Sequence, residues 1–218
     1  MGSMREVLSI VLASSNQGKL VELRELLSDL PVQILSAREA LGRTLEVIED
    51  GDTFQDNAIL KARAVSKATG LTALADDSGL EVLALGGRPG VRSARFAHER
   101  ATDAENNAAL LRELDEVGEV ERSARFRCVL ALVTPWDDVA RTVEGACEGQ
   151  ILRAPRGSGG FGYDPLFVVD GMSGRTMAEL GDQEKNSVSH RGCAVRALKP
   201  LLLVVLNERL DEAERVLG

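Results

Sequence analysis

The chain has 218 residues, of which 44% are hydrophobic and 28% charged, and its formal net charge at pH 7 is -8. This length fits one domain of ordinary to large size or two small ones, and the composition is that of a globular protein rather than a disordered or fibrous one. The acidic balance argues against a protein that grips a long nucleic-acid polymer, because that grip usually needs a broad basic surface. A mononucleotide remains compatible, since a few local cations, a metal ion and backbone N–H groups can bind it.

The two ends of the chain give expectations about processing and location. The N-terminus lacks a basic segment followed by an apolar one, and the apolar run Leu201 to Leu206 is far too short to cross a bilayer. We expect residues 1–3 to be an expression scar and residues 5–218 to form a single domain. We also expect a cytoplasmic protein without a membrane partner.

The first part of the chain predicts a strand, a polar loop and a helix. Residues 5–13 are rich in β-branched apolar residues, which is typical of a buried strand. A polar loop over residues 14–19 follows, and leucines then recur at helical spacing over residues 20–30 until Pro31. This order places the N–H groups of the loop at the N-terminus of a helix.

A second strand at residues 32–35 and a helix over residues 53–69 are predicted next. Thr53 begins a capping-box pattern, and Gly70 is a C-terminal stop signal. Apolar residues recur along one face of this helix, which leaves another edge free for polar side chains.

The remaining segments predict a mixed sheet. An apolar strand at residues 71–75 runs into the pair Asp76-Asp77, and a turn is expected at Ser78-Gly79. Further on, the pattern predicts a helix at residues 102–117 and an antiparallel hairpin of residues 125–133 with 139–148. A short strand at residues 166–169 and a final helix from Ser189 follow, with a kink or boundary at Pro200. This order is typical of an α/β fold with a mixed central β-sheet flanked by helices. It favours one domain with two lobes over two separate domains.

The acidic pair is the first candidate for chemistry. Carboxylates at a strand end suit a hard cation such as Mg²⁺, which takes oxygen ligands from one or two acids and from phosphates. Neighbouring strand residues point to opposite sides, so at most one of Asp76 and Asp77 is expected to face a common site while the other braces it. Glu49, in an irregular acidic stretch, is a candidate second ligand. The plain alternative is that all these acids are solvated surface charges.

One polar loop is a candidate for phosphate binding, and one helix edge is free for other polar work. The loop Ser14 to Lys19 resembles a phosphate cradle at a helix N-terminus, although it lacks the full P-loop spacing. A solvated turn with an N-capping side chain explains it equally well. Asn57 and Lys61 share the polar edge of the predicted helix over residues 53–69.

Two later segments are candidates for reading a base. Phe161 stands in a glycine-dense loop at residues 157–165, where an aromatic ring is suited to stacking on a base. A Phe that anchors the core is the alternative. His190 next to Arg191, at the start of the final helix, can donate to the acceptor edge of a base, although a lone His is more often structural.

These motifs occur together in one order, and with them the chain resembles the inosine triphosphate pyrophosphatase family, which hydrolyses deaminated purine nucleoside triphosphates. The resemblance covers nearly the whole chain after Met4. It rests on five segments: Ser14 to Lys19, Phe54 to Lys61, Ala75 to Leu80, Phe161 to Pro165 and Ser189 to Gly192. One departure is Ser14, where the family often has Thr, and the hydroxyl is kept.

The resemblance implies a fold of two lobes with the active site in the cleft between them, a Mg²⁺ cofactor and a homodimer. It implies a hydrolase that converts ITP, dITP and XTP to the monophosphate and pyrophosphate and so cleanses the nucleotide pool. By similarity, Asp77 binds Mg²⁺ and orients or deprotonates the attacking water. Glu49 is the implied second metal ligand, and Asp76 and Asn57 have supporting roles.

The same resemblance implies a set of substrate-binding residues. In it, Lys19, Lys61 and Lys185 would neutralise the triphosphate, and Phe161 would stack on the base. The backbone of residues 162–164 would read the 6-keto edge together with His190 and Arg191. The full implied set is Ser14, Ser15, Asn16, Gln17, Gly18, Lys19, Lys61, Ser78, Phe161, Gly162, Tyr163, Asp164, Lys185, His190 and Arg191.

Two alternatives stay open on the sequence. One is a nucleotide pyrophosphatase of the Maf type, with a similar fold and another base preference. The other is a non-catalytic nucleotide-binding module, which would keep the loops without needing the acids. The presence of both aspartates together with three lysines disfavours the second alternative.

Overall fold

The computed structural model describes residues 7–118, 121–137 and 139–217, and the predicted expression scar at residues 1–3 lies outside them. The strands are β1 (Leu8–Leu12), β2 (Val32–Ser36), β3 (Thr72–Val82), β4 (Ser123–Val133), β5 (Arg141–Ile151) and β6 (Phe167–Val169). The α-helices are α1 (Gln17–Leu26), α2 (Ala37–Leu41), α3 (Phe54–Thr69), α4 (Asp103–Glu113), α5 (Asp182–Val188) and α6 (His190–Leu217). A 3₁₀ helix, η2 (Gly90–Arg95), lies between β3 and α4.

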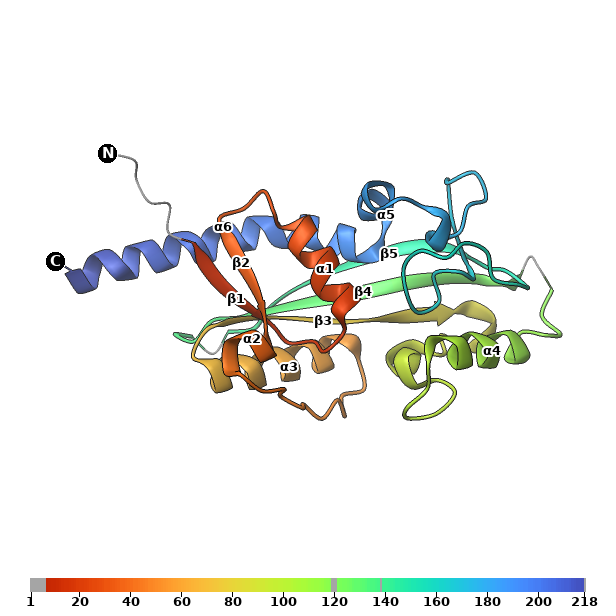
Figure 1. Cartoon of the computed structure of the whole chain (residues 1–218), viewed down its shortest axis with the longest axis horizontal. Coiled ribbons are helices and arrows are strands. Elements are labelled where there is room, and N and C mark those ends of the chain that lie inside the picture. The colour runs from red at the N-terminus through yellow and green to blue at the C-terminus, as the bar shows by residue number, and fades with distance from the viewer. Residues whose placement is uncertain (1–6, 119–120, 138, 218) are drawn as a thin grey trace.

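The strands form one mixed sheet in the order β2-β1-β3-β4-β5-β6. β1 is parallel to both β2 and β3, whereas β3, β4, β5 and β6 follow one another antiparallel. The long strands β3, β4 and β5 run through the whole molecule (Figure 1). The predicted α/β class with a mixed sheet is confirmed.

β3 differs from its prediction in a way that matters for the site. It runs for 11 residues and pairs with β4 from Ala73↔Val133 to Val82↔Ala124. The predicted strand end at the acidic pair and the predicted turn at Ser78-Gly79 were therefore wrong. Local sequence favours a turn there, but pairing with β4 overrides that preference, as tertiary context often does.

Several other boundaries also moved. α1 ends at Leu26, four residues before the predicted end, and α4 ends at Glu113 rather than near residue 117. α2 and α5 were not predicted. α6 begins at His190 and continues through Pro200, which lies on the exposed side of the helix, where the carbonyl that loses its N–H partner can reach water.

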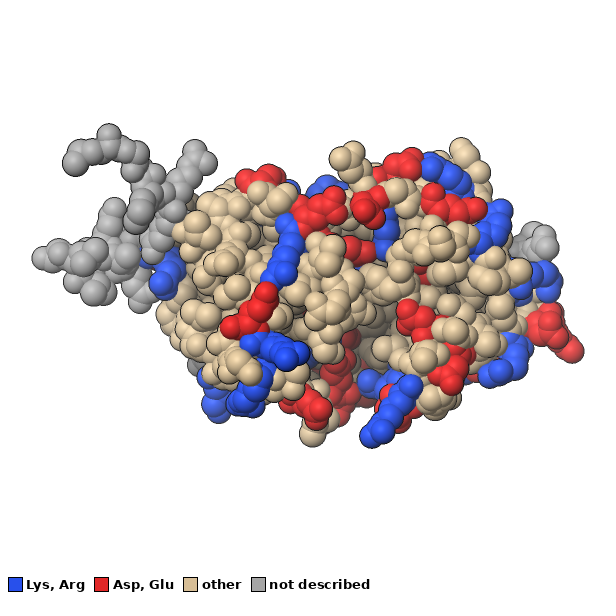
Figure 2. All heavy atoms as spheres, in the orientation of Figure 1, with Lys and Arg blue, Asp and Glu red and all other residues tan. Residues whose placement is uncertain are grey.

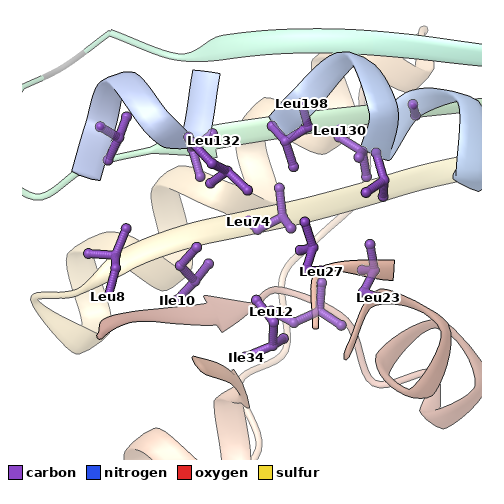
Figure 3. Packing of buried hydrophobic residues seen from close by; sticks show 14 of the residues in the cluster. Leu8, Ile10, Leu12, Leu23, Leu27, Ile34, Leu74, Leu130, Leu132 and Leu198 are labelled. Carbon is purple, nitrogen blue, oxygen red and sulfur yellow. The ribbon is translucent and has the colours of Figure 1, made fainter. Parts of the chain in front are cut away.

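Two hydrophobic clusters lie on opposite faces of the sheet in the first lobe. On one face, α1 and α6 pack against Leu74, Leu130 and Leu132 (Figure 3). On the other face, α3 packs through Phe54 and its neighbours against alanines and valines of β3 and β4. Alternation along β3 thus sends neighbouring residues to different helices.

A third cluster builds the second lobe around the far ends of the long strands. It joins Leu110 of α4 and the C-cap residue Leu114 to Phe126, Phe167 and Tyr163. Figure 2 shows a recess in the surface between the two lobes. Across the described residues, no helix is both long and apolar enough to cross a membrane.

One glycine sets how closely α6 approaches the sheet. A Cβ at Gly145 of β5 would collide with the carbonyl oxygen of His190, the backbone nitrogen of Ala194 and the Cβ of Cys193. Because two of these atoms are backbone, they cannot move aside cheaply. The missing side chain therefore allows the start of α6, which carries His190 and Arg191, to pack closely against β5.

Candidate active site

The site begins where β1 leaves the sheet. β1 pairs with β3 only as far as Leu12↔Leu74, and Ala13 N–H then donates to Leu74 C=O at 2.8 Å. The carbonyl of Asp76, two residues further along β3, points to the same side but meets no strand. Instead it accepts from the ammonium groups of Lys61 at 3.0 Å and Lys19 at 3.4 Å. Two cations from different helices thus take the place of a strand partner.

The Asp76 carboxylate is fully buried on the α1 and α6 face. It accepts from Lys19 Nζ at 2.6 Å, Arg191 Nε at 2.6 Å and Ser78 Oγ at 2.8 Å. Burial alone would favour the neutral acid, but the positive charges of Arg191 and Lys19 outweigh it and hold the pKa of Asp76 well below its ordinary value. Asp76 is therefore a permanently charged group that organises cations.

Arg191 extends this network to a residue that the sequence did not single out. Its side chain is 1% exposed, and Nη1 donates to Glu22 Oε2 at 2.5 Å while Nη2 donates to Ser78 Oγ at 3.1 Å. Glu22 of α1 also binds Lys185 Nζ at 2.7 Å. The only sequence signal for Glu22 is that it lies one helical turn after Lys19, which is a weak one.

Asp77 points to the opposite face of β3, as alternation predicted. Its Oδ1 accepts from Lys61 Nζ of α3 at 2.5 Å, and Glu49 Oε2 lies 3.5 Å from the same nitrogen. Burial raises the pKa of Asp77 against the opposing effect of Lys61. Burial disfavours the charged form of Lys61, but Asp77 and Glu49 outweigh it and raise its pKa.

Asn57 of α3 has a defined structural task, which is to hold Gly51. Its Oδ1 accepts from Gly51 N–H at 2.9 Å and its Nδ2 donates to Gly51 C=O at 3.2 Å. Arg95 at the end of η2 donates to the carbonyl of Glu49 at 3.2 Å. These bonds fix the irregular acidic stretch, so Glu49 is held near Lys61 rather than left on a free surface loop.

The loop before α1 follows its capping prediction. Asn16 is the N-cap, and its Oδ1 accepts from Lys19 N–H at 3.2 Å while Ser14 Oγ accepts from Asn16 N–H at 3.2 Å. A Cβ at Gly18 would lie 2.8 Å from the ring of Phe161. The glycine therefore lets the first turn of α1 approach the aromatic ring of the other lobe.

A pocket lies between this loop, β3 and the second lobe. Among its lining residues, ten were implied by the resemblance: Asn16, Lys19, Ser78, Phe161, Gly162, Tyr163, Asp164, Lys185, His190 and Arg191. Six were not: Gly79, Ser93, Ala94, Asp103, Asn106 and Phe126. Gly79 belongs to the Ala75 to Leu80 segment of the resemblance, whereas the other five come from β4, η2 and α4 and were not singled out from the sequence.

His190 is buried in this pocket. Its ring stacks on Phe126 with centroids 4.8 Å apart and planes 16° apart, and Nδ1 has no hydrogen-bond partner among the described residues. Burial, together with the charge of Arg191, lowers the pKa of His190 well below its ordinary value. The imidazole is therefore neutral at pH 7, and its Nδ1 is buried without a protein partner among the described residues.

The cations near Phe161 are already paired with acids. Lys185 Nζ binds Asp164 Oδ2 at 2.8 Å and lies 5.0 Å from the Phe161 ring centroid, and Arg191 Cζ lies 5.6 Å from it. Asp164 Oδ2 also accepts from Phe161 N–H at 3.0 Å. Burial raises the pKa of Asp164 despite Lys185. Lys185 thus belongs to the Phe161 end of the site.

The predicted residues therefore fall into two groups on either side of β3. Asp77, Lys61, Glu49 and Asn57 lie toward α3, and the pocket residues lie between α1, α6 and the second lobe. Ser15 and Gln17 are exposed on the loop. Asp76 joins the groups, because its carbonyl contacts both Lys19 and Lys61.

An acidic pair flanked by lysines, a capped loop at a helix start and an aromatic-lined pocket are typical of an α/β enzyme that acts on nucleotides. The chain belongs to the Ham1 family, whose model matches residues 10–201. A dITP/XTP pyrophosphatase of Desulforamulus reducens is 53% identical over 195 residues, covering 89% of this chain and 96% of the relative. The family resemblance expected from the sequence is confirmed.

Solved structures agree with this assignment. The Ham1 protein from Coxiella burnetii superposes with a TM-score of 0.80 at 48% identity and covers 90% of this chain and 99% of its own. A nucleoside-triphosphatase / dITP/XTP pyrophosphatase from Mycobacterium abscessus superposes with a TM-score of 0.70 at 46% identity, covering 89% of this chain and 99% of its own. Of the alternatives considered from the sequence, these findings support the inosine triphosphate pyrophosphatase assignment over the Maf type.

Replacing Asp76 by Ala tests the buried network. Asp76→Ala removes the carboxylate that pairs with Lys19 and leaves the buried Arg191 with Glu22 as its acidic partner, so the free energy of unfolding is expected to fall by about 3–5 kcal/mol in urea denaturation. The matched control is Glu113→Ala, which breaks an exposed pair with Arg88 and is expected to cost about 1 kcal/mol or less. Equal, small losses in both variants would contradict the structural role given to Asp76.

Proposed function

We propose that this chain is a Mg²⁺-dependent pyrophosphatase that hydrolyses ITP, dITP and XTP to the monophosphate and pyrophosphate. The observation that carries the proposal is that Asp77 and Lys61 lie apart from the aromatic pocket. Lys19 connects the two places, because it lines the pocket and contacts the same Asp76 carbonyl as Lys61. Such an arrangement provides one end for a triphosphate and one end for a base. The names of the relatives, dITP/XTP pyrophosphatases, support the substrate class.

Lys61 and Lys19 support the assignment of the triphosphate end. Both ammonium groups meet at the Asp76 carbonyl, and preorganised cations stabilise charge that develops on a leaving pyrophosphate. Ser14 and Asn16 add neutral polar groups at the start of α1, where backbone N–H groups favour an anion. In this proposal Asp77 orients the attacking water and takes its proton.

The donor set near Lys61 fits a magnesium ion. Asp77 and Glu49 share Lys61 as a neighbour, so their oxygens lie close together, and both are carboxylates. Within the described residues, no group of three or more His, Cys, Asp or Glu side chains could hold a metal. Two acids plus phosphate oxygens match the way Mg²⁺ is usually held. When bound, the ion would neutralise phosphate charge, with Asp77 and Glu49 as its protein ligands.

The pocket supports the base end. Phe161 offers a ring face, and the neutral His190 lines the same pocket and is in this proposal the donor to the base. A 6-keto group accepts a hydrogen bond there, whereas the 6-amino group of adenine would leave the donor unpaired, a mismatch that discriminates strongly. We further propose, from the family resemblance, that the protein is a cytoplasmic homodimer.

Asp77→Asn tests the catalytic assignment. The substitution keeps the side-chain size but removes the base, so kcat for pyrophosphate release from ITP with Mg²⁺ should fall by about 10²–10⁴-fold. Binding of ITP, followed by calorimetry, should persist because the lysines remain.

Asp29→Asn is the control, since it removes an aspartate from a surface pair with Lys199. Its turnover should match that of the wild type. Near-normal turnover by Asp77→Asn would refute the role of Asp77.

His190→Ala tests base reading. Loss of one hydrogen bond to the 6-keto group should lower kcat/KM for ITP by about tenfold, equivalent to about 1.4 kcal/mol, with the larger share in KM. The rate with ATP should change much less. The matched control is His98→Ala, because His98 is the other histidine of the chain and its side chain is 54% exposed. An unchanged ratio of ITP to ATP efficiency would remove His190 from base reading.

A further inference from the structure

Helix α4 holds the peptide groups of Gly162 from two sides. Gly162 N–H donates to Asp103 Oδ2 at 2.7 Å, and Gly162 C=O accepts from Asn107 Nδ2 at 2.9 Å. Neither α4 residue was expected to take part in the site. Gly162 N–H therefore has a side-chain acceptor from α4 in this structure, and its role in reading a base stays a prediction.

The two contacts come from one rigid surface. Asp103 and Asn107 are four residues apart on α4 and therefore lie on the same helix face. The first turn of α4 is fixed by a complete capping box, in which Thr102 and Glu105 bind each other's backbone N–H. Leu110 and Leu114, further along, are fully buried in the second lobe.

Gly162 directly follows Phe161, whose ring faces Gly18 of the first lobe. Gly162 has a φ of 63°, a left-handed conformation that glycine adopts without strain. Its neighbours are also fixed, since Phe161 N–H donates to Asp164 and Tyr163 OH donates to Ser93 C=O at 2.8 Å. The α4 contacts thus complete the support of the segment that aims Phe161 at Gly18.

We propose that Asp103 and Asn107 are positioning residues that set the place of the Phe161 ring and thereby the affinity for the nucleobase. This proposal rests on the proposed function, because it takes the pocket lined by Asp103, Gly162 and Phe161 as the base site. Loss of either contact frees the Gly162 peptide to rotate, and the ring then samples positions away from the base. The effect belongs to binding, so KM should change more than kcat.

Paired substitutions at Asp103 separate the hydrogen bond from the charge. Asp103→Ala and Asp103→Asn both remove the negative charge at the start of α4, so both lose the same interaction with the helix dipole. Only Asn keeps an oxygen that can accept from Gly162 N–H. We expect Asp103→Ala to raise KM for ITP by about five- to tenfold with kcat within about twofold of wild type, and Asp103→Asn to restore most of the affinity.

Asn107 provides an independent test. Asn107→Asp keeps the size but removes the N–H donor, so it should raise KM for ITP like Asn107→Ala. The double variant Asp103→Ala/Asn107→Ala should show less than the sum of the two single effects on binding free energy, because both contacts hold the backbone of one residue, Gly162.

Hydrogen exchange at Gly162 tests the contact without any assay of activity. The Gly162 amide should exchange slowly in the wild type and in Asp103→Asn, and faster in Asp103→Ala. The wild-type protein could show a protected Gly162 amide and yet release no pyrophosphate from ITP. That result would contradict the proposed function, and with it the effect on base affinity, while the contact between α4 and Gly162 would stand.

Two other results would overturn the proposal itself. One is an unchanged KM for ITP in Asp103→Ala, whether or not exchange at Gly162 becomes faster. The other is an equal rise in KM for Asp103→Asn and Asp103→Ala, since that would assign the effect to charge rather than to the hold on Gly162.

Discussion

The site depends on a strand that stops early. β1 leaves the sheet after Leu12, and the carbonyl of Asp76 on β3 is then left without a backbone partner in the sheet. A buried carbonyl must find a donor, and here Lys19 and Lys61 supply it from two different helices. The gap left by one short strand is therefore the place where two cations are held close together.

Burial of the Asp76 carboxylate makes this arrangement rigid. A buried charge is tolerated only when it is paired and hydrogen-bonded, and Asp76 has Lys19, Arg191 and Ser78 around it. Through Arg191 and Glu22 the same network reaches Lys185, which lies beside Phe161. The network therefore links α1, β3, α5 and α6, and it gives the two ends of the site a fixed relation.

Part of this could be predicted from the sequence, because some signals are local. Thr53 and Gly70 marked both ends of α3, and Lys61 follows from helix geometry once those ends are known. Alternation along a strand correctly sent Asp76 and Asp77 to opposite faces. The length of β3 could not be predicted, because Asp-Asp-Ser-Gly favours a turn locally and the partner that keeps it extended is β4, far away in the chain. Asp103 and Asn107 are polar residues on a helix, and only the folded chain shows that they meet Gly162.

The most direct test of the account is a substrate panel of ITP, dITP, XTP, ATP, GTP and dUTP, each with and without Mg²⁺. Pyrophosphate and orthophosphate would be measured separately. The account predicts pyrophosphate, and not orthophosphate, from ITP, dITP and XTP only when Mg²⁺ is present, with much slower release from the other three. Similar rates across all six nucleotides, or release of orthophosphate as the primary product, would contradict it.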